Sequence, residues 1–330
     1  FKLQLENGNI CNLSCTMCPI DDLTRKKGQI SFENFKRIFD EVMPCYLNLT
    51  GIGEPFLHAD IFKVIEYAKS KRTFVKLDSN ATLISQKVAE KIIDSKLDLL
   101  SISIDGTTKK TYEAIRRRAN FDHVMKNLKN LAELNKQRKD SNTEIHLFMV
   151  LQKDNFHQLP DFIRLGNQLG VDSINGTFVK DLGGIDNNQK HITWYDDQRM
   201  RSLVEESLKL AKKGKAKLRM KGLFEYMRSG KINNNKDAPC FMAWYSPFVT
   251  WDGYLNSCCL SSNNDIVFGN VLEKSFMEIW NGPEAIAFRK QIVKKRVGLC
   301  AKCGVEENFI YNKFKPLYKI PIINKLSARR

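Results

Sequence analysis

Short apolar segments alternate with amphipathic segments through the first half of the chain. Residues 1–6 (FKLQLE) alternate apolar and polar side chains as a half-buried strand does, and residues 31–42 (SFENFKRIFDEV) space their apolar side chains as a helix does. Ser31 is placed to cap that helix. The same order of strand and helix repeats to residue 179, which predicts a parallel sheet in an α/β fold.

Five further strands are predicted after the first, each followed by a helix or a linker. They cover residues 46–50, 73–79, 98–104, 143–151 and 172–179. Six strands of this kind can build a partial barrel, in which the loops at the carboxyl ends of the strands carry the chemistry. Polar or reactive residues directly after each strand are therefore the first candidates for a site.

The pattern changes after residue 180. Residues 181–190 (DLGGIDNNQK) are typical of a loop, and residues 196–215 predict one long helix. A boundary between two structural units is therefore expected in this region.

A hairpin and a helix are predicted nearer the C-terminus. Residues 246–251 (SPFVTW) and 254–259 (YLNSCC) flank Asp252-Gly253, a pair that favours a two-residue hairpin turn. Residues 275–295 then predict a single helix.

The composition is that of a globular protein with a basic surface. The chain has 330 residues, of which 42% are hydrophobic and 27% charged, and its formal net charge is +16. No apolar run approaches the ~20 residues that cross a membrane, and the start lacks a signal-peptide pattern, so a cytoplasmic location is expected. Lysine and arginine are spread along helical faces without a nucleic-acid-binding motif, which argues against a nucleic-acid partner and leaves an anionic substrate open.

Eight of the nine cysteines are distributed in two groups. In a reducing compartment such residues are more often metal ligands, redox groups or apolar fillers than disulfides. Cys45 stands alone and is expected to be packed in the interior. The two groups predict two metal sites, and their members are Cys11, Cys15 and Cys18 in the first and Cys240, Cys258, Cys259, Cys300 and Cys303 in the second.

The first group lies in the loop directly after the first predicted strand. Cys11, Cys15 and Cys18 have the spacing C-x3-C-x2-C. Three thiolates on one loop can hold three irons of a cubane cluster and leave the fourth iron open to a substrate or cofactor. A structural zinc site requires four ligands, and no histidine or fourth cysteine lies nearby in the sequence.

This spacing after a first barrel strand resembles the signature of the radical S-adenosylmethionine (radical SAM) superfamily. The resemblance implies that the open iron binds SAM and that one electron from the cluster cleaves it. The resulting 5′-deoxyadenosyl radical would then take a hydrogen atom from the substrate. It also implies a reductant such as flavodoxin or ferredoxin.

Two loops resemble the parts of this family that hold SAM through backbone groups and an amide. Residues 50–56 (TGIGEPF) are similar to the Gly-rich motif that receives the SAM amino group, which implies contacts through Gly51, Gly53 and Glu54. Asn80 follows the third strand and resembles the asparagine of a second cofactor loop. Turn chemistry is the alternative interpretation of Asn80.

A third stretch, residues 101–116, resembles the region that holds the ribose and carboxylate of SAM. The resemblance implies roles for Ser103, Asp105 and Arg116, because a guanidinium offers a planar fork of donors to a carboxylate. Asp105 has turn chemistry as its alternative. Arg118 stands where many members of the family carry glycine.

The second cysteine group resembles the auxiliary-cluster extension of SPASM and twitch enzymes. Twelve residues separate Cys240 from Gly253, four more separate Gly253 from Cys258, and Cys300-x2-Cys303 follows. No cysteine follows Cys303, which favours the shorter twitch form with one auxiliary 4Fe–4S cluster on these four cysteines. Without the N-terminal signature, a zinc ribbon would be preferred.

Cys259 is adjacent to Cys258, and neighbouring strand residues point to opposite faces. The four-residue gap after the glycine selects Cys258 as the ligand. Cys259 is then a packed apolar residue, a substitute ligand or a candidate hydrogen-atom donor.

The expected fold is a partial (β/α)6 TIM-like radical SAM barrel followed by a small α+β twitch/SPASM-like domain. The expected divisions are the barrel in residues 1–185, a helical linker in 186–238, the auxiliary-cluster domain in 239–310 and a basic tail in 311–330.

The expected activity is dehydrogenation of a carbohydrate or another small molecule. No added leader-peptide-binding domain precedes the first strand in this sequence, which favours that interpretation. One alternative is a radical SAM epimerase or a peptide-modifying maturase or cross-linking enzyme. Another is a non-catalytic, metal-stabilised protein that binds nucleic acid or an anion.

Overall fold

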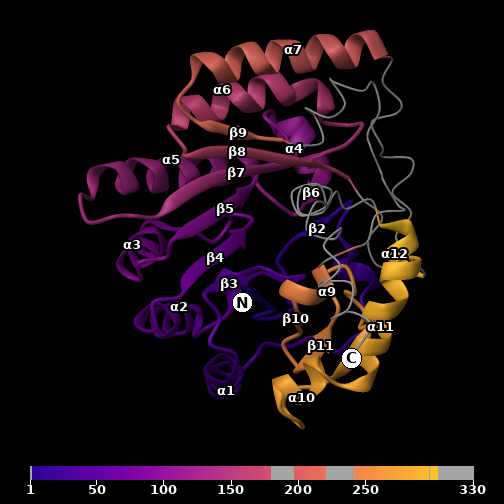
Figure 1. The fold of residues 1–330 in the computed structure, drawn as a ribbon. Helices are drawn as coiled ribbons and strands as arrows, with labels where there is room; N and C mark the ends of the chain where they lie inside the picture. Colours follow the sequence, from indigo (N-terminus) through magenta and orange to yellow (C-terminus); the bar gives the residue numbers. More distant parts are fainter. Residues whose placement is uncertain (1, 180–196, 221–239, 241, 297, 304–330) are drawn as a thin grey trace, which may run out of the picture.

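The protein is described by a computed structural model that covers residues 2–179, 197–220, 240, 242–296 and 298–303. One continuous sheet runs through these residues, with helices packed along it (Figure 1). A second, two-stranded sheet lies near the first cysteine group.

Six parallel strands form the centre of the large sheet and confirm the six that the sequence predicts. Neighbouring strands pair in parallel in the order in which they are named here, which is the arrangement expected of a partial barrel. They are β1 (Lys2–Leu5), β3 (Tyr46–Leu49), β4 (Phe74–Ser79), β5 (Leu99–Ser103), β7 (Glu144–Leu151) and β8 (Ser173–Phe178).

Helices connect these strands and carry the expected caps. The Ser31 hydroxyl accepts a hydrogen bond from the Asn34 amide at 3.2 Å, which confirms its capping role. Leu169 ends the last of these helices and Gly170 follows it with φ 68°, a left-handed conformation that glycine adopts without strain. The helices are α1 (Phe32–Val42), α2 (Ile61–Ser70), α3 (Gln86–Asp94), α4 (Lys109–Ile115), α5 (Phe121–Gln137) and α6 (Leu159–Leu169).

Alternation along the strands separates an apolar face from a polar face. Leu47 is paired with Val75, and both are fully buried in the hydrophobic core. Asn48 and Lys76, one position further along, are paired on the opposite face. Burial of the apolar face against the helices stabilises the fold, and the polar face is left as the wall of the candidate site.

The sheet continues beyond the boundary expected at residue 185. Helix α7 (Asp197–Lys213) packs beside α6, and strand β9 (Lys217–Arg219) pairs in parallel with β8 (Figure 1). Part of the segment expected as a helical linker thus adds a strand to the sheet. The expected loop at residues 181–190 lies outside the described residues.

The predicted hairpin is confirmed, and it belongs to the same sheet. Gly253 occupies its turn with φ 90°. A third antiparallel strand follows, which the sequence did not predict, and the first hairpin strand pairs in parallel with β1, with Gln4 opposite Phe248. The elements are α9 (Met242–Tyr245), β10 (Phe248–Val249), β11 (Tyr254–Asn256) and β12 (Val267–Asn270).

The prediction of one helix over residues 275–295 is wrong. The structure has two helices there, α10 (Phe276–Trp280) and α11 (Pro283–Lys294). Pro283 has no backbone N–H to continue the first helix, so it begins a new one after Gly282. A short helix, α12 (Leu299–Lys302), follows and contains Cys300.

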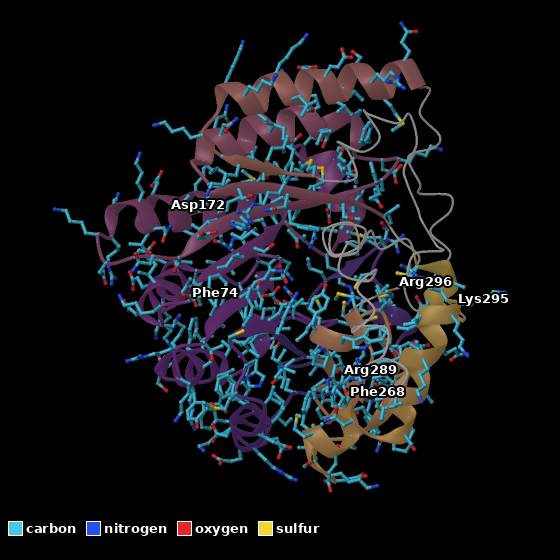
Figure 2. All side chains as sticks on the ribbon, in the orientation of Figure 1. Phe74, Asp172, Phe268, Arg289, Lys295 and Arg296 are labelled. Carbon is cyan, nitrogen blue, oxygen red and sulfur yellow. The ribbon has the colours of Figure 1, made fainter. Side chains whose placement is uncertain are left out.

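Arg289 connects helix α11 to helices α9 and α10. Its Nε donates to the Ala243 carbonyl at 2.8 Å and one Nη donates to the Trp280 carbonyl at 2.7 Å. The guanidinium also lies over the Trp280 ring, 4.1 Å from its centroid, and Phe268 packs against the same ring. Figure 2 shows Arg289 and Phe268 in the C-terminal part of the fold. No helix within the described ranges is long and apolar enough to cross a membrane.

Candidate functional site

The first cysteine group lies on the loop that follows β1. Within that loop, strand β2 (Ser14–Cys15) pairs antiparallel with strand β6 (Arg116–Arg117), so that Cys15 lies opposite Arg116. A 3-10 helix (Pro19–Asp22) begins directly after Cys18. All nine cysteines are among the described residues, and none forms a disulfide.

One pocket brings together this cysteine loop and the ends of β3, β4 and β5. All three cysteines of the loop line it. Every residue expected to contact SAM lines it as well, with the exception of Asp105. These lining residues are Gly51, Gly53, Glu54, Asn80, Ser103 and Arg116.

The thiols of the loop are held in a setting that disfavours their unliganded thiolate form. Burial raises the pKa of Cys11 and Cys15, and it raises that of Cys18 to about 12. Donors nevertheless point at one sulfur: the Leu13 amide lies 3.4 Å and the Asn80 amide nitrogen 3.8 Å from Cys11 Sγ. Buried thiols with donors aimed at sulfur fit a cationic cluster, which supplies the charge that holds thiolates.

The spacing of the side chains also bears on the kind of metal site. Within the described ranges, no three His, Cys, Asp or Glu side chains converge as the ligands of a single metal ion do. In a cubane each thiolate binds a different iron, so its ligands stand further apart. Three thiols on one loop have the ligand number that leaves one iron of a cubane open.

Gly53 allows the Gly-rich loop to approach the cysteine loop closely. A Cβ atom on Gly53 would lie 2.6 Å from the Gly8 carbonyl oxygen and 3.0 Å from that of Ile10. The next residue, Glu54, donates its backbone N–H to the Ile10 carbonyl at 2.9 Å. Only glycine fits this approach, so the two loops are fixed against each other.

The Glu54 side chain joins the loop after β3 to the end of β4. Its carboxylate accepts hydrogen bonds from the Ser79 hydroxyl and the Asn80 amide, each at 2.8 Å, and from the Phe56 amide at 3.3 Å. Burial raises the pKa of Glu54 to about 7. The carboxylate thus organises the pocket wall through Asn80.

Stability should depend on pH through Glu54. Because its pKa is raised from 4.5 to about 7, the folded chain keeps a proton that the unfolded chain releases between these values. The contribution of the Glu54 proton to the free energy of unfolding is therefore complete at low pH and is lost as pH rises through about 7. Urea titrations of metal-free protein measure the difference in unfolding free energy between the unmutated chain and Glu54→Gln. We expect this difference to fall as pH rises across this range.

The matched control is Glu41→Gln, which removes one exposed carboxylate from α1. A flat or rising difference for Glu54→Gln between pH 4.5 and 7 would contradict the burial of an ionisable group there.

Asp105 lies behind the pocket wall and supports Arg116. The Asp105 side chain is fully buried, and its Oδ2 accepts from Arg116 Nε at 2.8 Å and Nη2 at 2.7 Å. Its Oδ1 accepts from the Val150 amide at 2.7 Å.

Arg118 adopts φ 70°, a left-handed conformation that explains why glycine suits this position in the family.

The second cysteine group is gathered beside the hairpin. Burial raises the pKa of the Cys258 thiol, and three neighbouring thiols raise it further, those of Cys259, Cys240 and Cys303. Burial likewise raises the pKa of Cys300, and Cys303 adds to that effect. The four predicted ligands and Cys259 are thus assembled from distant parts of the chain, and their individual roles remain predictions.

Besides the position of Asp105 behind the pocket, two further outcomes differ from expectation. Cys45 is exposed, so the expectation that it is packed is wrong; it lies in the turn before β3 and not on the buried face of the strand. The pocket is also lined by Thr50 and Asp78, which the sequence analysis missed. Thr50 donates to Asp78 at 2.5 Å and Lys76 pairs with Asp78 at 2.9 Å, and polar residues at alternate positions of a central strand were the available signal.

Comparison with known families and proteins agrees with this site. Residues 6–166 match the Radical SAM superfamily, and residues 240–304 match SPASM, an iron-sulfur cluster-binding domain. The chain therefore belongs to the radical SAM superfamily and carries a SPASM iron–sulfur domain. It is a radical SAM enzyme whose cofactors are S-adenosylmethionine and 4Fe–4S clusters.

Similar proteins include maturases. The mycofactocin maturase MftC of Mycolicibacterium smegmatis is 26% identical over 308 residues, which cover 89% of this chain and 73% of that protein. The antilisterial bacteriocin subtilosin biosynthesis protein AlbA of Bacillus subtilis is 23% identical over 309 residues, 89% of this chain and 64% of that protein. Streptococcus suis SuiB, solved with the precursor peptide SuiA, has the same fold, with a TM-score of 0.71 at 17% identity, covering 92% of this chain and 70% of SuiB.

Proposed function

We propose that the protein modifies a peptide, by taking a hydrogen atom from one of its residues. The observation that carries this proposal is the similarity to MftC, a maturase, over 89% of this chain. The name of AlbA and the precursor peptide bound to SuiB point the same way. These relatives favour the peptide-modifying alternative over dehydrogenation of a carbohydrate.

The cysteine groups supply ligands for the clusters in this proposal. Cys11, Cys15 and Cys18 would hold the cluster that binds SAM. When bound, the reduced cluster and SAM supply a 5′-deoxyadenosyl radical. An auxiliary cluster would be held by Cys240, Cys258, Cys300 and Cys303.

Residues around the first group would bind and orient SAM. The loop with Gly51 and Gly53 presents backbone groups at the pocket beside the cysteine loop. Asn80 and Ser103 offer polar side chains to the same pocket. Arg116 offers a guanidinium that Asp105 holds in one orientation, which suits recognition of a carboxylate.

The polar face of the sheet provides the wall against which a peptide would lie. Lys76 and Asp78 pair there and keep about a quarter of their side-chain surface exposed, at 24% and 23%. The pair offers both a cationic and an anionic group to a peptide backbone or side chain. A reductant such as flavodoxin or ferredoxin is part of the proposal as the source of the electron.

The test uses anaerobically reconstituted protein, SAM, dithionite and synthetic peptides encoded beside the gene. We expect 5′-deoxyadenosine to form together with a peptide of altered mass or altered stereochemistry. In deuterated water, a peptide lighter by two hydrogens indicates oxidation or cross-linking, and one deuterium at unchanged composition indicates epimerisation.

The candidate hydrogen-atom donor Cys259 enters through the same experiment. Deuterium incorporation that is lost in Cys259→Ala would assign that role to it. Deoxyadenosine formation that leaves every peptide unchanged, while a small molecule is consumed, would refute the peptide proposal.

A further inference from the structure

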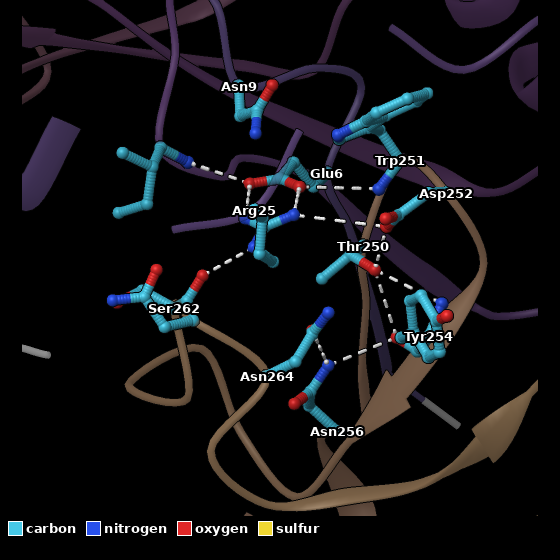
Figure 3. Close-up of polar contacts among 12 residues, drawn as sticks. Glu6, Asn9, Arg25, Thr250, Trp251, Asp252, Tyr254, Asn256, Ser262 and Asn264 are labelled. Atoms are coloured by element: carbon cyan, nitrogen blue, oxygen red, sulfur yellow. Dashed lines mark hydrogen bonds and ion pairs between the residues drawn. The ribbon is translucent and has the colours of Figure 1, made fainter. Parts of the chain in front are cut away.

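A buried ion pair lies between the barrel and the auxiliary-cluster unit. Glu6 follows β1, and Arg25 lies in the loop after the three cysteines (Figure 3). The exposed fractions of their side chains are 0% and 4%. Two hydrogen bonds of 2.9 Å join the guanidinium to both carboxylate oxygens, which is the bidentate geometry that fixes orientation as well as distance.

The carboxylate also holds one backbone amide on each side of the pair. Glu6 Oε1 accepts from the Ile52 amide at 3.2 Å, and Oε2 accepts from the Trp251 amide at 3.3 Å. Ile52 lies in the Gly-rich loop of the pocket, whereas Trp251 lies at the turn of the hairpin. A single side chain thus connects the SAM-binding loop with the auxiliary-cluster unit.

Arg25 and a neighbouring contact extend this connection to the loop after Cys258. Arg25 Nε donates to the Ser262 carbonyl at 2.6 Å. Asn263 accepts from the Thr24 amide at 2.9 Å. We name Glu6, Arg25, the residues that these two bind and the neighbouring Thr24–Asn263 contact the cluster junction.

The residues of the junction pack closely against two glycines. A Cβ atom on Gly51 would lie 2.3 Å from Glu6 Cγ, and one on Gly28 would lie 2.3 Å from the ring of Trp251. A pair taken from water to this depth gains little net stability, because desolvation offsets the attraction between the charges. The hydrogen bonds of the pair are directional, so they fix the position of one loop against the other. An apolar contact is not directional and would let the two surfaces slide past each other.

The position of the junction along the chain connects it with both cysteine groups. Asp22, whose carbonyl accepts from Asn263 at 3.4 Å, lies four residues after Cys18. Ser262 lies four residues after Cys258. Each side of the junction is therefore a short, direct continuation of a proposed ligand loop.

We propose that the cluster junction, with Glu6 and Arg25 as its central positioning residues and the Thr24–Asn263 contact beside them, fixes the two cluster-binding loops relative to each other. This inference rests on the proposed ligand roles of the two cysteine groups. Electron transfer between bound clusters depends steeply on their separation, so a rigid junction would keep that separation constant while a substrate enters and leaves the pocket.

The experiment compares Arg25→Lys and Asn263→Ala with a matched control, Arg37→Ala. Arg25→Lys keeps the buried charge but removes the Nε bond to Ser262, and Asn263→Ala removes an exposed contact without exposing a charge. Arg37 also joins the two units, through a 3.1 Å bond to the Leu272 carbonyl, but far along the chain from both cysteine groups. If Arg25→Lys does not fold, Asn263→Ala decides the question.

Two readouts are used on the holoprotein, and neither needs substrate. Amide hydrogen exchange over residues 257–266 should speed up by about tenfold in both test variants, as expected for loss of one hydrogen bond to a charged or backbone group, and should not change in Arg37→Ala. In dithionite-reduced protein, the spin–spin interaction between the two clusters should become weaker, or the range of its strengths broader, in the test variants only.

Unchanged exchange, equal changes in Arg37→Ala, or faster exchange with an unaltered spin–spin interaction would each overturn the proposal. The last outcome would leave the junction with a purely structural role. Absence of deoxyadenosine formation would instead refute the proposed function, since exchange and spin measurements are made without turnover.

Discussion

Replacing Cys11, Cys15 and Cys18 together by alanine should halve the iron content and abolish SAM cleavage. Unmutated protein reconstituted without oxygen is expected to hold two 4Fe–4S clusters, about eight irons, and the variant one cluster, about four irons. Deoxyadenosine formation should stop, because no open iron remains in the pocket that these cysteines line. Iron and sulfide analysis together with chromatography of the nucleoside products measures both effects.

The single variant Cys15→Ala tests the same assignment more sharply. Cys15 is opposite Arg116 in the small sheet, and loss of its thiolate should be enough to abolish cleavage. Cys45→Ala is the matched control, since it removes an exposed thiol outside both groups. About four irons in the unmutated protein, or undiminished deoxyadenosine formation by Cys15→Ala, would contradict the assignment.

Replacing Arg116 by methionine should lower the free energy of unfolding by about 3–5 kcal/mol, the cost of leaving a buried charge without its partner. Asp105 has no exposed surface, so water cannot replace the two hydrogen bonds that Arg116 provides. Urea denaturation of matched metal-free preparations measures the change.

Two further variants separate the ion pair from its surroundings. Arg117→Ala changes the exposed neighbour in the same strand and should have little effect. Adding Asp105→Asn to Arg116→Met removes the orphaned charge and should recover part of the loss. A loss below about 1 kcal/mol in Arg116→Met would show that the pair is solvated in solution.

The sequence predicts the six central strands because each is long enough to show a period and is followed by a turn or a cap. It does not predict the pairing of β10 with β1, since Phe248–Val249 is too short to carry a pattern and its partner lies far away in the chain. The break before Pro283 was visible in the sequence, but the apolar spacing on both sides favoured one continuous helix.

Some features of the candidate site can likewise be predicted from the sequence and others cannot. Spacing alone is enough to predict Cys11, Cys15 and Cys18 as cluster ligands, because three thiols on one loop have few other uses. The sequence cannot tell that Asp105 lies behind the pocket and not in it, since a carboxylate after a strand can face either way. Glu6 and Arg25 follow no period or motif, and only the fold brings them to the hairpin.

The parallel pairing of β1 with β10 has a consequence during synthesis of the chain, because β1 is made long before its partner. Ribosomes add about 5–20 residues each second, and β10 emerges roughly 10–40 s after β3, so one edge of the first strand stays open for that time. An unpaired strand edge is a template for association with other chains. The strand that leads into the three-cysteine loop is therefore open to such association until the C-terminal hairpin has been made.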